Sequence, residues 1–594
     1  MNGIPERNLI RGVAALLLLL SCVAAVSAGI PGDVNSDCRI SVAELSGVIH
    51  PYMKATYLDE NIESLDREAL TCAAYNYLIY LPRDEEPVDT LHLGLQLHDF
   101  SLMNAFVPPW YDDSNFCGFT HLPLVIFNPD MSIAPCLAQD WEISPDGRSI
   151  TFTLVEGARW HDGMPVTPED VAFSFEYWKE HILFYQGKWL DTYLDRTEVV
   201  GDRTVIITFN EPVAATTLMG DIPATYIVPK HVWEMVDDPK KYNGPDALVG
   251  CGPFVFDRYD QDAGVAYLNA NRYHSGGVPA IDRIEWRYYR DIFSLAMALK
   301  KGEIDAKLDY YNPVPWSYAS DLAGSSGVNV GSVPDIGVPF HLVFGYRQHP
   351  AEMPEFREAI SYAIDYQGLA DTVTAGYGHI PGQGYLPTTV PGYDPSIPSC
   401  EYNLTKAKEI LDAAGFVDTD GDGLREDPDG KKLRIPITPY LRPLHIRCAE
   451  VLADQLKETG LDIYVESLSA EEFKNRATVN RDYTMLIGLS TPYVNMAAPS
   501  GIFYYVDMPG RIGTCTDPAL VDLTERILFA TDIEGMKSAR SELQHYVARE
   551  RPIIPLIWAD PLYPYRTDRW TGWVPMNGYG PCNYWSWMAL EPVA

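Results

Sequence analysis

Hydrophobic and polar residues alternate in several short segments of the chain, beginning with "DTLHLGLQLHDF" at residues 89–100. A period of two predicts a β-strand with one buried face. Two more alternating segments follow Leu137 and are separated by the turn residues 145–147, so they predict a β-hairpin. Between residues 280 and 470, strand-like and helical segments alternate, as parallel β-α-β units require. The pattern therefore predicts an α/β protein.

A helix is predicted to begin at Pro168, directly after a second tight turn at residues 161–163. Thr167 can accept a hydrogen bond as the N-cap, and proline suits the first helical position because its missing N–H group has no partner there. Asp170 stands where its side chain can accept a hydrogen bond from the backbone of Thr167, which completes a capping box. Local sequence alone thus predicts where this helix starts.

The N-terminus combines two basic residues, Arg7 and Arg11, with an apolar run of about fifteen residues. Small side chains at residues 26–28 suit cleavage by signal peptidase, so we expect a signal peptide over residues 1–28. The mature chain is then secreted to the periplasm or the cell surface. Two alternatives are open, namely lipid attachment at Cys22, because "LLSC" resembles a lipobox, and an uncleaved anchor that tethers the protein to the membrane.

Length and charge restrict the class of protein further. A chain of 594 residues is long enough for several lobes, each with a core of its own. Its 81 acidic and 45 basic residues give a formal net charge of -36. A field of this sign repels phosphate backbones, so we expect no nucleic-acid partner.

An acidic segment, "DVNSDCRISVAE", follows the predicted signal peptide at residues 33–44. It places oxygen-bearing side chains at positions 1, 3, 5, 9 and 12 of an EF-hand loop and a backbone carbonyl at position 7, which is the ligand set of calcium. The segment resembles one repeat of a dockerin module, so we expect a small helical calcium module at residues 29–81 and a linker at residues 82–90. The alternative is an acidic, solvated turn. The predicted ligands are Asp33, Asn35, Asp37, Arg39, Ser41 and Glu44.

A second calcium loop is predicted at residues 418–429, "DTDGDGLREDPD", directly after a helical segment. Acidic residues again occupy positions 1, 3, 5, 9 and 12, and glycine stands at position 6, where the loop turns sharply. We interpret the loop as a structural calcium site on the surface, with an unliganded acidic turn as the alternative. The predicted ligands are Asp418, Asp420, Asp422, Leu424 through its carbonyl, Glu426 and Asp429.

Catalytic motifs are missing from the sequence. His161 and Asp162 in "RWHDG" form a candidate acid–base pair, but both lie in the predicted tight turn, so we interpret them as structural. The chain has no GxSxG elbow, no HExxH helix and no GxxxxGK[ST] phosphate loop. The residues therefore favour a binding protein over an enzyme, and no catalytic residue is predicted.

The segment from Leu137 to Trp178 resembles the signature of the family 5 extracellular solute-binding proteins, the peptide- and nickel-type receptors of ABC importers. "VGCGPFVFDRY" from Val249 is similar to the VGTGPF turn of that family. Further motifs follow in the family's order, so the resemblance covers roughly residues 88–594. These motifs are "NANRYHSGGVPAIDRIEWRYYRD", "ALKKGEIDA", "FREAISYAIDYQGLADTVTAGYG", "YNLTKAKEILDAAGF" and "RERPIIPLIWADPLYPY".

The resemblance implies a two-lobed, periplasmic-binding-protein-like α/β fold of type II, in the large peptide-receptor subclass, with a hinge between the lobes. It assigns residues 91–290 to lobe I, residues 291–559 to lobe II and residues 560–594 to a C-terminal return to lobe I. The implied partners are a peptide or small chelate ligand and an ABC permease in the membrane. We expect the receptor to be a monomer.

The resemblance also implies which residues bind the ligand. Arg442 stands where peptide-binding members carry an arginine that pairs with a ligand carboxylate, a role that suits the planar guanidinium. An ordinary ion pair is the alternative. Tyr493 and Met496 lie in "STPYVNM", which is similar to a loop of the nickel-chelate receptors in which a histidine contacts the metal.

These observations predict an extracytoplasmic receptor that binds a peptide or a related small solute between two lobes and delivers it to a membrane permease. A nickel-chelate receptor of the same family is the first alternative. A calcium-dependent adhesion or scaffold protein of the cell surface is the alternative from another class.

Overall fold

The computed structural model describes residues 89–96, 104, 118–181, 185–239, 241–244, 246–307, 314–332, 340–388, 390–489, 506–507, 512–577 and 580–593. The signal peptide, the N-terminal calcium module with its ligands from Asp33 to Glu44, and the loop with Tyr493 and Met496 lie outside the described residues. No described helix combines the length and the apolar character that a membrane span needs.

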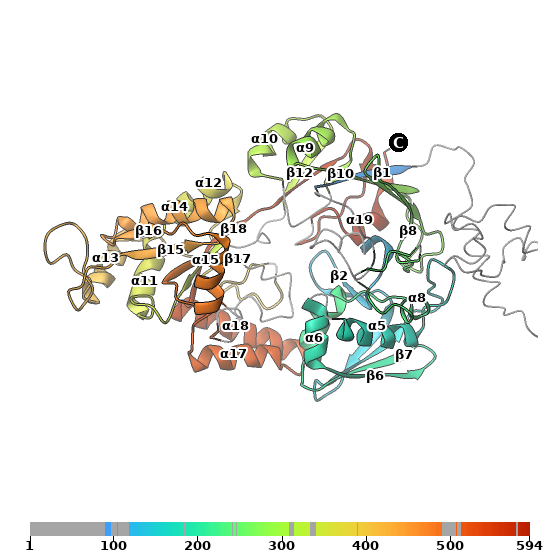
Figure 1. The fold of residues 1–594 in the computed structure, drawn as a ribbon, viewed down its shortest axis with the longest axis horizontal. Helices are drawn as coiled ribbons and strands as arrows, with labels where there is room; N and C mark the ends of the chain where they lie inside the picture. The colour runs from blue at the N-terminus through green and yellow to red at the C-terminus, as the bar shows by residue number, and fades with distance from the viewer. Residues whose placement is uncertain are drawn as a thin grey trace, which may run out of the picture.

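A seven-stranded sheet forms the centre of the first lobe (Figure 1). In spatial order its strands are β12 (Val328–Ser332), β19 (Leu562–Arg566), β11 (Ala306–Lys307), β1 (Thr90–Gln96), β10 (Arg283–Tyr289), β9 (Val265–Ala270) and β8 (Phe254–Asp260).

Both faces of this sheet are covered. The alternating residues Leu91, Leu93 and Leu95 of β1 are fully buried and pack with Trp587 of α19 (Tyr584–Ala589). On the opposite face, Gly94 approaches α9 (Ile292–Lys301) so closely that a Cβ atom would lie 3.4 Å from Leu295. The strand that the sequence pattern predicts at residue 89 is therefore confirmed, with the predicted apolar face buried.

A four-stranded antiparallel sheet adds a second layer to the first lobe. The predicted hairpin is formed by its first two strands, and the predicted capping box starts the helix that packs on the sheet. The Asp170 N–H donates to Thr167 Oγ1 at 3.3 Å, and the Thr167 N–H donates to Asp170 Oδ2 at 2.8 Å. The strands are β4 (Ala138–Ile143), β5 (Ser149–Leu154), β7 (Thr204–Phe209) and β6 (Leu194–Gly201), and the helices nearby are α5 (Pro168–Glu180), α6 (Tyr185–Tyr193), α7 (Ala214–Leu218) and α8 (Lys230–Trp233).

The second lobe is built on a six-stranded sheet with helices on both faces. The adjacent residues Leu342 and Val343 point to opposite faces and belong to different apolar cores. The strands in order are β14 (Gly378–His379), β18 (Ile553–Ala559), β13 (Phe340–Phe344), β17 (Met485–Leu489), β15 (Ile435–Pro439) and β16 (Ile463–Val465). One core contains α11 (Pro354–Ala363), α12 (Tyr366–Thr374), α13 (Leu404–Ala413) and α14 (Pro443–Lys457), and the other contains α17 (Pro518–Leu528) and α18 (Ile533–Glu550).

Short elements complete the described chain. They are β2 (Val125–Phe127), β3 (Ile133–Pro135), β20 (Trp570–Thr571), β21 (Glu591–Pro592), α10 (Ala319–Ala323), α15 (Ala470–Lys474), the 3₁₀ turns Ile222–Ala224 and Trp316–Tyr318, and a π-helical turn at Asn475–Asn480.

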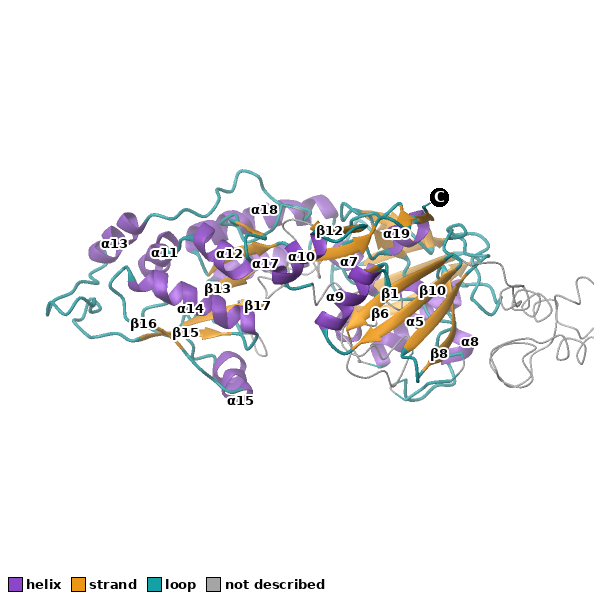
Figure 2. Cartoon of the chain, turned by 90° about the horizontal axis from the view of Figure 1, so that it is seen from above, coloured by secondary structure: helices purple, strands orange, loops and turns teal. Residues whose placement is uncertain are grey.

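The two lobes lie end to end, and the chain passes between them near the middle of the molecule (Figure 1, Figure 2). β18 of the second lobe continues into β19 of the first lobe through Asp560 and Pro561. The Trp316 indole donates to the carbonyl of Asp560 at 2.8 Å and holds this passage from the first-lobe side. The prediction of two α/β lobes is confirmed.

The boundary between the lobes lies later in the sequence than expected. β11 and β12 follow residue 290, yet both pair into the first-lobe sheet, where β19 lies between them. The assignment of β11 and β12 to the second lobe is therefore wrong. Strand pairing over long sequence distances decides the boundary, and the local pattern carries no information about it.

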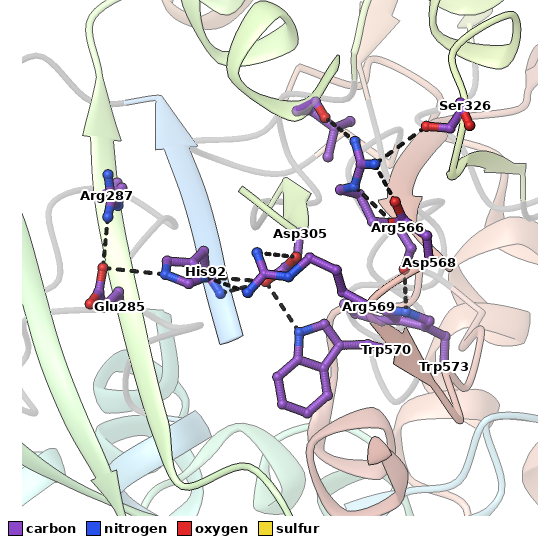
Figure 3. Close-up of polar contacts among 11 residues, drawn as sticks. His92, Glu285, Arg287, Asp305, Ser326, Arg566, Asp568, Arg569, Trp570 and Trp573 are labelled. Atoms are coloured by element: carbon purple, nitrogen blue, oxygen red, sulfur yellow. Dashed lines mark hydrogen bonds and ion pairs between the residues drawn. The ribbon is translucent and has the colours of Figure 1, made fainter. Parts of the chain in front are cut away.

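A buried carboxylate fastens the C-terminal segment to the first-lobe sheet (Figure 3). Asp305 is fully buried and accepts hydrogen bonds from the backbone N–H of His92 at 2.8 Å and from the indole of Trp570 at 3.2 Å. Arg569 pairs with the other carboxylate oxygen at 3.1 Å. Three segments that are distant in sequence thus meet at one side chain.

The lobes also meet at a second place, away from the β18–β19 passage. The Thr216 hydroxyl of α7 donates to the carbonyls of Ile527 and Leu528, at 3.1 and 2.9 Å, where α17 ends. Thr216 is fully buried, and Leu528 belongs to the apolar core of the four-stranded layer.

Candidate ligand-binding site between the lobes

Several strand ends of the second lobe meet at the edge where the chain crosses to the first lobe. β18 ends at this edge, and β13 begins beside it, because Phe340 pairs with Ile557. β17 ends there too, since it runs antiparallel to β13 and pairs Leu489 with Phe340. β15 runs parallel to β17 and therefore ends at the same edge.

The first lobe presents equivalent strand ends at this crossing. β19 starts at the crossing and runs antiparallel to β11, so the carboxyl end of β11 points toward the start of β19. β1 is parallel to β11 and to β10, so all three strands end on the same side of their sheet. Ligands of open α/β sheets bind outside the carboxyl ends of parallel strands. The two sheets turn such ends toward the crossing, which makes the space between the lobes the candidate site.

We use the term inter-lobe edge for Phe340, Tyr440, Arg442 and His445 of the second lobe. Tyr440 and Arg442 connect β15 to α14, and Arg442 is the N-cap residue of this helix. Arg442 is exposed, its guanidinium carbon lies 5.8 Å from the centroid of the Tyr440 ring, and it forms no ion pair with any described carboxylate. The ion pair considered as an alternative is thus not formed within the described part of the chain.

His445, three residues after Arg442, belongs to the inter-lobe edge although no sequence motif marks it. Its ring packs between Phe340, at 4.7 Å between centroids, and Tyr440, at 5.6 Å. Its exposure is 4%, and neither ring nitrogen has a hydrogen-bond partner among the described residues. Leaving such a group without a partner costs about 1–3 kcal/mol. The only signal in the sequence is a histidine in the first turn of a predicted helix, and that position alone does not reveal burial.

Burial determines the protonation state of His445. Removal from water lowers the pKa of this imidazole to about 3, and the neighbouring His341 and Arg442 contribute in the same direction. The ring is therefore neutral at physiological pH, with one nitrogen as a donor and the other as an acceptor. Arg442 thus supplies the positive charge at the inter-lobe edge, and His445 supplies a neutral polar group.

His161 and Asp162, the candidate acid–base pair, face different partners. His161 Nε2 lies 3.1 Å from the Gly252 carbonyl, and its Nδ1 accepts a hydrogen bond from the Gly250 N–H at 3.2 Å. Asp162 instead pairs with His231 at 2.5 Å. Both residues are almost fully buried, so they hold the turn at residues 250–252 and the helix beside it, which agrees with the structural interpretation.

The second predicted calcium loop is exposed on the second lobe. Asp418, Asp420 and Asp422 bring carboxylate oxygens within 4.8 Å of one another, as three ligands of one ion would. One further predicted ligand is arranged differently. Glu426 is buried and accepts hydrogen bonds from the backbone and hydroxyl of Thr419, both at 2.7 Å.

A cation of the protein itself contacts this acidic group. The Lys432 ammonium lies 2.7 Å from Asp420 Oδ2 and 2.5 Å from Asp422 Oδ2, so it neutralises part of the charge that calcium would neutralise. Asp429 is not among the residues whose carboxylate oxygens converge in this group. Calcium binding at this loop stays a prediction.

Two α/β lobes, the passage from β18 to β19 that joins them, and strand ends that face the space between the lobes define a receptor that encloses a solute. The chain belongs to the bacterial extracellular solute-binding proteins, family 5, whose middle region matches residues 132–507. Membership confirms the receptor class and the expectation that the protein is not an enzyme. It also agrees with the expected location outside the cytoplasm.

Known proteins with similar sequences and structures support this assignment. The chain is 24% identical over 464 residues to di/tripeptide-binding protein 1 of Pseudomonas aeruginosa. This alignment covers 73% of the chain and 82% of the relative. The chain is 25% identical over 379 residues to the dipeptide-binding protein of Escherichia coli, covering 60% and 67%. A periplasmic oligopeptide-binding protein of Thermotoga maritima has the same fold, with a TM-score of 0.67, 22% identity, and coverage of 85% of this chain and 99% of that one.

Proposed function

We propose that this protein is the extracytoplasmic receptor of an ABC importer, and that it binds a short peptide between its lobes and delivers it to a membrane permease. Relatives named for di- and tripeptide binding align with most of the chain, which supports this class of ligand. The receptor would work as a monomer, since a single chain contains both lobes and the crossing between them.

Arg442 is the single observation that carries the choice of ligand. An exposed guanidinium without a carboxylate partner among the described residues is available to a carboxylate that arrives from outside. The forked geometry of its N–H groups matches the two oxygens of a carboxylate, and the N-terminus of α14 adds a favourable field for a negative charge. A peptide with a free C-terminus provides this group.

The nickel-chelate alternative depends on Tyr493 and Met496, which lie outside the described residues. Methionine is a weak ligand for nickel compared with imidazole, so the described chain gives no reason to prefer a metal complex. The dockerin-like module and a lipid or signal anchor likewise depend on N-terminal residues outside the description.

Thermal unfolding of the purified, ligand-free protein tests the proposed function. The panel consists of di- and tripeptides with free termini, the same peptides as C-terminal amides, and a nickel–histidine chelate. A ligand at about one hundred times its dissociation constant stabilises the folded state by about 2.7 kcal/mol, which gives a measurable rise in Tm. We expect the free peptides to raise Tm and the amides to raise it less. A rise with the chelate alone, or with no member of the panel, contradicts the proposal.

A further inference from the structure

His445 has an environment that suits a ligand contact better than a place in the core. It is the third residue of α14, a 15-residue helix, and a side chain at this position can reach back over the helix N-terminus toward the N-cap. The contact with Tyr440, which precedes the helix, shows that the ring does point back in this way. The first turn of the helix and the imidazole therefore face the same region.

Arg442 and His445 surround one aromatic ring. The Arg442 guanidinium lies 5.8 Å from the centroid of the Tyr440 ring, and the His445 ring lies 5.6 Å from the same centroid. The N-cap residue Arg442 makes no side-chain hydrogen bond to the first turn of α14, so its side chain does not cap the backbone N–H groups that could bind an anion. Leu441 and Leu444 are both exposed beside it, which provides an apolar surface next to the charged group.

The two ring nitrogens of His445, which have no hydrogen-bond partner in the described part of the chain, are the second, independent sign of a ligand. Buried polar groups in folded proteins nearly always have a partner, and those that lack one usually serve a purpose. Here the imidazole is neutral because burial lowers its pKa to about 3, so it can donate one hydrogen bond without adding charge. A peptide whose carboxylate lies at Arg442 would bring acceptor oxygens to this position.

We propose that His445 is a specificity-determining residue of the binding site, and that it donates a ring N–H to an oxygen of the peptide whose carboxylate Arg442 holds. The inference rests on the proposed function and adds a second, uncharged recognition group to it. Both ring nitrogens are covered in the described conformation. The contact therefore requires side chains of the inter-lobe edge to move when the peptide binds.

Substitution of His445 tests the inference through two quantities that change in opposite directions. His445→Phe keeps a ring between Phe340 and Tyr440 and removes the unpartnered nitrogens. We expect it to raise Tm of the ligand-free protein and to weaken binding of the tightest free peptide of the panel roughly tenfold or more. His445→Gln retains an N–H donor and should recover part of the affinity.

A matched control is His121→Phe in the first lobe. His121 is also fully buried, and one of its ring nitrogens has no partner among the described residues. It packs against Gly250 and Thr120 inside the first lobe and is not exposed to a ligand, so its substitution should leave peptide affinity unchanged. Calorimetric titration gives the affinities. Equal affinities for the wild type and His445→Phe overturn the inference and leave the proposed function intact. Absence of peptide binding by the wild type overturns the proposed function and, with it, the inference.

Discussion

Acidification should destabilise the first lobe, because three buried histidines surround one turn of its backbone. His161 and His274 contact carbonyls of residues 250–252, and His121 lies against Gly250. Burial lowers the pKa of His121 to about 3 and the pKa values of His161 and His274 to about 4, compared with 6.5 for an unperturbed histidine. All three are therefore neutral in the folded lobe at neutral pH.

The direction of the effect follows from where protons bind. Below about pH 6.5 the unfolded chain binds a proton at each of these residues, whereas the folded chain stays neutral until about pH 4. The free energy of unfolding therefore decreases as the pH is lowered from about 6.5 to about 4. Between pH 7 and pH 5.5 each residue lowers the free energy of unfolding by about 1.3 kcal/mol, so the three together lower it by about 4 kcal/mol. Carboxylates change little in this range because their usual pKa values lie near 4.

Urea denaturation followed by tryptophan fluorescence, repeated from pH 7 to pH 5.5, measures this loss. His274→Gln removes one titrating group, so the loss should decrease by about one third. His545→Gln is the control, because the His545 side chain is 54% exposed and lies in α18 of the second lobe, away from this turn. His231 acts in the opposite direction. Burial is the largest single influence and lowers its pKa, but the hydrogen bond to Asp162 and the charges of Asp162, Asp170 and Asp246 together raise the pKa above its ordinary value. The variants are therefore compared with the wild type, and equal losses for His274→Gln and the wild type would refute the reasoning.

Three further outcomes are expected. Gly250→Ala should prevent folding of the first lobe, because the added Cβ atom would lie 1.8 Å from the Thr120 carbonyl oxygen. The control variant Gly201→Ala should fold normally, since its Cβ atom would meet no atom within 4 Å. Circular dichroism of the soluble fractions distinguishes the two outcomes. Arg442→Ala should weaken binding of a peptide with a free C-terminus by about 2 kcal/mol or more, and Arg442→Lys should weaken it by less. Binding of the same peptide as a C-terminal amide should change little. An equal loss of affinity for the free peptide and the amide would contradict the proposal that Arg442 holds a carboxylate. Calcium should raise Tm, and EGTA should reverse the rise. Lys432→Gln should increase the rise in Tm, because the lysine competes with calcium for the same carboxylates. Identical melting curves in calcium and in EGTA would show that the loop is an unliganded acidic turn.

Local sequence was a sufficient guide wherever local chemistry determines structure. The capping residues at Thr167 and Asp170 start α5 as predicted, and Asn403 caps α13 by accepting a hydrogen bond from the Lys406 N–H at 3.0 Å. These features depend on residues three positions apart, so tertiary contacts do not have to be known. The two lobes were predicted from the family motifs for a different reason. These motifs occur along the whole chain in the family's order, so they indicate the fold of the family as a whole.

Other features depend on contacts between distant segments, which a single sequence does not show. β11 and β12 join the first-lobe sheet because β19 returns between them from the end of the chain. The burial of His445 follows from Phe340, which lies more than one hundred residues earlier in the sequence. The family resemblance predicted a ligand contact for Arg442. Its lack of an ion pair with any described carboxylate depends on where those carboxylates lie in space, which the sequence does not show.

The passage of β18 into β19 has a consequence for the order in which an exported chain can fold. β1 stands at the beginning of the described chain, but its sheet includes β19, which is synthesised near the end. The first lobe therefore stays incomplete while most of the polypeptide crosses the membrane. The second-lobe sheet also needs β18, directly before this passage. Neither lobe can close its core early, which would keep the chain competent for translocation until its last strands emerge.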